Sequence, residues 1–125
     1  MTPYKKKQFG IWMDQYNATV VGRTDPDSAE LVILGHLRKP HVSGNSNENA
    51  ANNQAVASSQ KFFKEIAAIM PNVDEVHVTG TGQVQEQFIR FLARTPQYRN
   101  TTTSESTSER MTDAELLAFI SAHFN

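Results

Sequence analysis

A short strand, a glycine-containing turn and an amphipathic helix follow one another over residues 73–94, and this succession limits the fold more than any other feature of the sequence. Val76 and Val78 alternate in the strand, and Gly80-Thr81-Gly82 turns the chain. The helix repeats apolar residues at helical spacing, namely Val84, Phe88, Phe91 and Leu92. This order of elements is typical of α/β proteins. The pattern therefore predicts an α/β domain.

Three strands precede this unit, and a strand and a helix follow it. Apolar stretches bounded by turn residues predict an antiparallel meander of strands over 9–14, 18–23 and 30–37. A long helix ends near Met70, and the polar stretch 98–108 predicts a fifth strand at a sheet edge. Thr112 and Glu115 form a capping box that begins a last helix. Right-handed crossovers then give a three-layer, ribonuclease-H-like βββαβαβα topology with a mixed five-stranded sheet in the order 3-2-1-4-5.

The composition indicates one domain and excludes several kinds of chemistry. Residues 1–125 are expected to form a single domain of 14.0 kDa. The chain has no cysteine, which excludes disulfides, thiolate metal sites and cysteine nucleophiles. The net charge of -1 excludes attraction to nucleic acid over the whole surface, but it is compatible with a local basic patch. With no membrane-spanning run or signal peptide in view, we expect a cytoplasmic protein without cofactor, membrane partner or DNA partner.

Residues 40–53 form a predicted flexible polar loop. Five asparagines lie between Asn45 and Asn53, and Val42 is the one large apolar residue. A loop of this length has either a function or no selected role, and both interpretations stay open. As a functional element it presents amides to a large partner and becomes ordered on contact. The candidate binding residues are His41, Ser43, Gly44, Asn45, Ser46 and Asn47.

The turn Gly80, Thr81 and Gly82 is a second candidate site. A turn that precedes a helix exposes free N–H groups beside the positive end of the helix dipole, which favours a phosphate. This turn has neither the lysine of a P-loop nor a GxGxxG spacing. The other interpretation is that the two glycines only permit a tight passage from strand to helix.

Asp14, at the end of the first predicted strand, is the third candidate. Nucleases of the ribonuclease-H type place an acid there and hold two metal ions with further carboxylates. Glu65 in the long helix is a second acid, but the fourth strand offers none, so the set is short of charge for two metals. The competing interpretation is that Asp14 accepts hydrogen bonds from the backbone of the following turn.

The four histidines do not have the spacing of a metal site, and no metal site is predicted. His77 alternates with valines in the fourth strand. We expect each histidine to be partly buried and hydrogen-bonded. They are His36, His41, His77 and His123.

Short motifs in a fixed order carry a resemblance to a known family. They are Phe9-Gly10-Ile11-Trp12-Met13-Asp14, Lys39-Pro40-His41, Lys61-Phe62-Phe63-Lys64-Glu65-Ile66, Val76-His77-Val78-Thr79-Gly80-Thr81-Gly82 and the closing helix. In this order they resemble the central domain of the eukaryotic and archaeal peptide-chain release factor and of the Pelota ribosome-rescue proteins. Small bacterial proteins of that superfamily, often described as translational machinery or host attachment proteins, are more similar still. The resemblance extends from Phe9 to Phe124.

The resemblance implies a fold and a setting, but not a reaction. In the release factors the loop before the long helix carries Gly-Gly-Gln, which enters the peptidyl-transferase centre and positions water on the peptidyl-tRNA ester. Here Gly44 matches one glycine, and no glutamine matches because Gln54 lies further along. The flanking domains that read codons and bind partner factors are not expected in this chain. What the resemblance implies is therefore a setting at the ribosome or on RNA.

Three functional hypotheses follow. The leading one is a non-catalytic module associated with the translation apparatus, which binds the ribosome or structured RNA through the 40–53 loop. The alternative is a metal-dependent ribonuclease-H-like phosphodiesterase that uses Asp14 and Glu65. The third is a structural or protein-interaction domain, which forms a homodimer through the edge of the fifth strand.

Overall fold

The computed structural model describes residues 7–23, 30–39 and 60–124, and the predicted 40–53 loop lies outside these ranges. Residues 60–68 are helical and precede β4. The other elements are β1 (Gln8–Met13), β2 (Asn17–Gly22), β3 (Val32–Arg38), β4 (Glu75–Gly80), α2 (Gln83–Arg94), the short 3-10 helix η1 (Pro96–Tyr98), β5 (Thr102–Thr107) and α3 (Asp113–Phe124).

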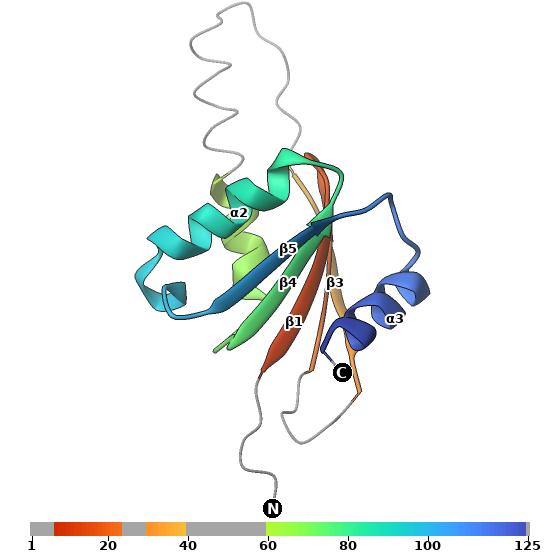
Figure 1. Ribbon diagram of the computed structural model, residues 1–125. Helices are drawn as coiled ribbons and strands as arrows, with labels where there is room; N and C mark the ends of the chain where they lie inside the picture. The colour runs from red at the N-terminus through yellow and green to blue at the C-terminus, as the bar shows by residue number, and fades with distance from the viewer. Residues whose placement is uncertain (1–6, 24–29, 40–59, 125) are drawn as a thin grey trace, which may run out of the picture.

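The five strands form one mixed sheet in the order β3-β2-β1-β4-β5. β1 pairs antiparallel with β2 and parallel with β4, while β3 and β5 are the two edges. Helical residues 60–68 and α2 cover one face of the sheet, and α3 covers the other (Figure 1). The three-layer α/β fold and the strand order predicted from the sequence are confirmed.

The two faces of β1 belong to two apolar cores. Phe9, Ile11 and Met13 are buried in the core beneath α2 and the preceding helix. Trp12 packs in the second core, with Leu116 and Ile120 of α3. This alternation is the expected consequence of the two-residue period of a strand. Among the described residues, no helix is long and apolar enough to cross a bilayer.

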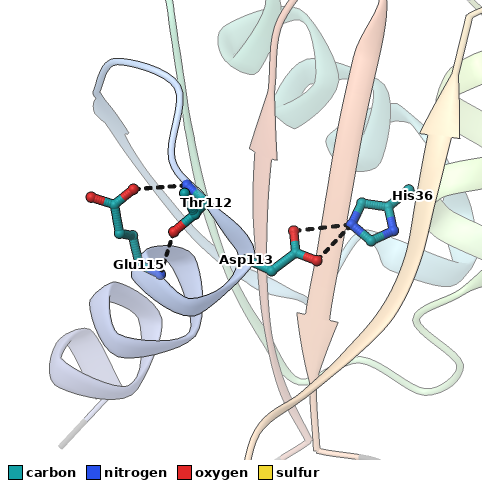
Figure 2. A network of polar contacts seen from close by, with 4 residues as sticks. All are labelled: His36, Thr112, Asp113 and Glu115. Carbon is teal, nitrogen blue, oxygen red and sulfur yellow. Dashed lines mark hydrogen bonds and ion pairs between the residues drawn. The ribbon is translucent and has the colours of Figure 1, made fainter.

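α3 begins at the predicted capping box (Figure 2). The Thr112 amide donates to Oε1 of Glu115 over 2.8 Å, and the Glu115 amide donates to Oγ1 of Thr112 over 3.2 Å. The hydrogen bond from the Thr112 amide, followed by one from the Thr112 side chain, holds the pKa of the Glu115 carboxyl below its ordinary value. The same helix end reaches β3, where Nε2 of His36 lies 3.0 Å from each carboxylate oxygen of Asp113.

His77 links β4 to β5 through side-chain hydrogen bonds beneath α3. Its ring is 3 % exposed, and its two nitrogens lie 2.8 Å from Oγ of Ser104 and of Ser106. The His123 ring lies against it at a tilt of 33°, with 3.9 Å between ring centroids. Burial, followed by the charge of His123, lowers the pKa of His77 from 6.5 to about 4. The expectation of a buried, hydrogen-bonded histidine is confirmed at His77.

Two other histidines differ from that expectation. His36 and His123 have hydrogen-bond partners, but both are exposed. The cause at His36 is its position on the edge strand β3, where the ring reaches over the sheet to Asp113 at the start of α3 (Figure 2). His123 lies in the last turn of α3, beside solvent. His41 lies outside the described residues.

The polar strand β5 is at the sheet edge, as predicted. Its six residues, Thr102–Thr107, contain no large apolar side chain. A polar edge limits uncontrolled strand pairing. Homodimer formation through this edge stays a prediction.

Gly10 lets α3 approach β1 closely, and its substitution tests that contact. A Cβ at Gly10 meets Cγ1 of Ile120 at 2.3 Å, whereas a Cβ at Gly35 meets only Cδ1 of Ile69, at 3.2 Å. We expect Gly10→Ala to lower the free energy of unfolding by about 1–3 kcal/mol, measured by urea denaturation. Gly35→Ala is the matched control and loses less. Equal losses for the two variants contradict this packing.

The lowered pKa of His77 predicts a pH-dependent stability. As the pH falls, the unfolded chain binds this proton at pH 6.5, whereas the folded protein binds it only at about 4. The free energy of unfolding therefore decreases between pH 6.5 and about 4, by an amount on the order of 2–3 kcal/mol. Urea denaturation of wild type and His77→Gln at several pH values checks this. The variant loses most of the dependence and His36→Gln keeps it; an unchanged dependence in His77→Gln is the contrary result.

Candidate nucleic-acid interface

One edge of the sheet gathers the turns that follow β1 and β4. The parallel register pairs Met13 with Gly80, so both strands end at the same level. The backbone amide of Lys39, directly after β3, donates to the carbonyl oxygen of Tyr16 over 2.7 Å. In open α/β sheets, ligands bind outside the carboxyl ends of parallel strands. We call this region, from the Asp14–Tyr16 turn to the Thr81–Gln83 turn, the carboxyl edge.

Asp14 organises its own turn. Its Oδ1 accepts hydrogen bonds from the backbone amides of Tyr16 and Asn17, over 2.8 and 2.6 Å. The interpretation of Asp14 as a turn acid is confirmed. Within the described ranges, no group of three or more His, Asp and Glu side chains is placed to hold a metal ion. The phosphodiesterase that uses Asp14 and Glu65 stays a prediction.

The glycine turn is built for close packing. Gly80 is buried, and a Cβ there meets the carbonyl oxygen of Met13 at 2.0 Å. The amide of Gly82 donates to Oε1 of Gln85 over 3.2 Å, so one of the amides at the start of α2 already has a partner. Both observations support the tight-turn interpretation of Gly80, Thr81 and Gly82. Phosphate binding by these residues stays a prediction.

Gln85 fixes this turn to the neighbouring strand, a role that is not predicted from the sequence. Its side chain is 1 % exposed, and its Nε2 donates to the backbone oxygen of Ser106 in β5 over 3.1 Å. Both ends of the amide are therefore used, one on Gly82 and one on β5. The signal in the sequence is a glutamine at the third position of a helix, where it can reach back to the cap.

Two adjoining hollows open at the carboxyl edge. The larger, of about 460 Å³, lies between the Asp14–Tyr16 turn and the first turn of α2, and Thr81, Gln83 and Gln87 line it. The smaller, of about 220 Å³, extends toward the long helix, and Lys39, Phe62 and Phe63 line it. Both hollows share four lining residues: Gln15, Tyr16, Val84 and Gln87. We call the two hollows together the edge cleft.

Tyr16 gives the edge cleft its aromatic surface. Its side chain is 55 % exposed, and no other large hydrophobic side chain in the described ranges is exposed. Gln15, Gln83 and Gln87 line the same hollow, and each of their side-chain amides both donates and accepts hydrogen bonds. An exposed ring beside such amides is suited to stacking and edge recognition of a planar heterocycle.

Neither Tyr16 nor the three glutamines is predicted as a site residue from the sequence. Gln83 and Gln87 are four residues apart, which places them on one face of α2. An aromatic residue in a tight turn was the other available signal. Neither signal indicates that the turn and this face of α2 lie side by side in the folded protein.

The predicted loop residues lie outside the described ranges, but the chain on either side of them lies at this edge. Lys39 is the last described residue before the loop, and the chain is described again from Gln60. Lys39 and Phe62 both line the smaller hollow. Lys39 and Phe62, which come before and after residues 40–59 in the sequence, therefore both lie at the edge cleft.

Comparisons with known proteins place the fold. No protein-family model matches the sequence, and no curated protein matches it. The structure is similar to the archaeal translation termination factor aRF1, with a TM-score of 0.57 and 15 % identity over 91 % of this chain and 33 % of that one. It is similar to Archaeoglobus fulgidus Pelota, with a TM-score of 0.60 and 14 % identity over 96 % of this chain and 32 % of that one.

Thermoplasma acidophilum Pelota is a third structural neighbour, with a TM-score of 0.53 and 15 % identity over 96 % of this chain and 33 % of that one. The chain thus spans about a third of the length of the solved structures it matches. At these identities the likeness concerns the fold. The predicted resemblance to a release-factor and Pelota domain is confirmed at that level.

Proposed function

We propose that this chain is a non-catalytic module of the translation apparatus, and that it binds the ribosome or structured RNA through its carboxyl edge. The contact surface combines the edge cleft with the adjoining 40–53 loop, including His41, Ser43, Gly44, Asn45, Ser46 and Asn47. Such a partner implies a cytoplasmic setting. No peptide-release chemistry is proposed, because the loop lacks Gly-Gly-Gln.

The observation that carries the proposal is the position of the chain on either side of the loop. Lys39 and the helical residues Phe62 and Phe63 line the edge cleft, and the Lys39 amide donates a hydrogen bond to the carbonyl oxygen of Tyr16. Residues 40–53 are a long polar stretch of the sequence, and the described residues before and after it line a cleft that also holds the exposed ring of Tyr16. Loops held by a rigid scaffold are where binding residues concentrate.

The structural neighbours support the setting. One is a translation termination factor, and two are Pelota proteins. Each of them is about three times as long as this chain, so their activities as whole proteins are not transferred. The proposal takes from these neighbours only the class of partner, which is the translation apparatus. It gives this domain a role in binding and none in catalysis.

Co-sedimentation with purified ribosomes tests the proposal. The matched variant replaces residues 43–53 by a Gly-Ser linker of the same length, which keeps the connection between β3 and the long helix. We expect the intact protein to sediment with ribosomes and the variant to bind at least about tenfold more weakly, since one lost contact of about 1.4 kcal/mol suffices for that factor. No sedimentation of the intact protein contradicts the proposal, and equal sedimentation of both proteins removes the loop from the contact.

A further inference from the structure

We propose that a groove along α2 binds an unpaired RNA strand, with a base on Tyr16 and the backbone on Arg90 and Arg94. This inference rests on the proposed function and names the form of RNA that the domain contacts. A third hollow, of about 440 Å³, carries it. Phe63, Gln87, Ala93 and the two arginines line this hollow, between the helical residues 60–68 and α2.

The three hollows are continuous. Gln87 lines all of them, and Phe63 lines both the smaller hollow of the edge cleft and the third hollow. Together they follow α2 from its first turn at the carboxyl edge to Arg94 in its last turn. The 12 residues of α2 span about 18 Å, which accommodates a few nucleotides of an extended strand. We call this path the α2 groove.

The charge along the α2 groove changes from one end to the other. Lys39 lies beside the edge cleft, and Arg90 and Arg94 lie at the far end. Asp14 is the one acid that lines the three hollows, at the Tyr16 end, and the backbone amides of its own turn occupy its Oδ1. The groove therefore offers an aromatic ring with amides at one end and cations at the other, which matches a base followed by phosphates.

Arg90 is paired with Glu86, one turn before it on α2, and both side chains are mostly exposed. An exposed pair of this kind contributes little to stability, and one contact leaves several of the five guanidinium donors available. Lys61 and Lys64 are also exposed on the neighbouring helix. The two helices carry four cations against two acids, namely Lys61, Lys64, Arg90 and Arg94 against Glu65 and Glu86.

The segment 109–124 on the opposite face has the reverse balance. It carries three acids against one cation: Glu109, Asp113 and Glu115 against Arg110. All four residues are exposed. A polyanion is thus attracted to the helical face of α2 and repelled from that of α3. A charge of -1 for the whole chain conceals this separation.

Fluorescence anisotropy with a labelled single-stranded RNA of about 12 nucleotides tests the groove, with a hairpin of the same composition as comparison. We expect the single strand to bind more tightly than the hairpin. Arg90→Gln/Arg94→Gln weakens the affinity about tenfold and lowers the slope of log affinity against log salt by about 1.4, because two phosphate contacts are lost. Tyr16→Ala weakens it about fivefold or more with an unchanged slope, and Tyr16→Phe retains it.

The matched control is Arg38→Gln/Arg110→Gln, which makes the same change of net charge at two arginines that line none of the three hollows. It keeps the affinity of the wild type. Circular dichroism confirms that each variant is folded. The inference is overturned if the wild type binds no RNA at low salt, or if the Arg38→Gln/Arg110→Gln control loses as much affinity as Arg90→Gln/Arg94→Gln. It is also overturned if the hairpin binds as tightly as the single strand, or if polyglutamate of equal charge displaces the RNA as well as unlabelled RNA does.

The two tests fail separately. The variant with the 43–53 linker retains the whole α2 groove, and we expect it to bind the RNA strand like the wild type. If this variant loses ribosome binding and retains binding of the RNA strand, both proposals are supported. Ribosome binding by the intact chain without any binding of the RNA strand overturns the groove and leaves the proposed function in place.

Discussion

The parallel pairing of β1 with β4 is the constraint on which the rest of the structure depends. Six consecutive pairs, from Gln8 with Glu75 to Met13 with Gly80, hold the two central strands in register. The register brings the turns after both strands to one level, and the close contact of Gly80 with the Met13 carbonyl leaves no room for a side chain between them. Gln85 then ties the start of α2 to β5. The edge cleft exists because these ends coincide.

The sheet also separates charge. Helical residues 60–68 and α2 carry an excess of cations, while the segment that contains α3 carries an excess of acids. Because the sheet lies between them, a partner meets two faces of opposite character (Figure 1). A nearly neutral protein can in this way be selective for a polyanion on one side. In the proposed groove, Tyr16 and the glutamines supply contacts that salt does not screen, and such contacts distinguish an unpaired strand from other polyanions.

Local patterns were sufficient for the fold. The strand order followed from handedness rules, the capping box at Thr112 from spacing, and the polar edge strand β5 from its composition. The turn role of Asp14 followed from its residue type. The groove was out of reach, because Tyr16, Phe63 and Arg94 belong to three elements that only tertiary packing brings together. The exposure of His36 was missed for a similar reason: Asp113, its partner, lies 77 residues away in the chain.

The central claim is that RNA contacts the carboxyl edge and the α2 groove, and that the α3 face takes no part. Nuclear magnetic resonance of the ¹⁵N-labelled protein during titration with an RNA strand measures this most directly, because each backbone amide reports its own surroundings. The account predicts that the amide signals of Tyr16, Gln87 and Arg94 shift progressively while those of Leu116 and Ile120 stay in place. Shifts concentrated in α3 and β5, with the α2 signals unchanged, would contradict it.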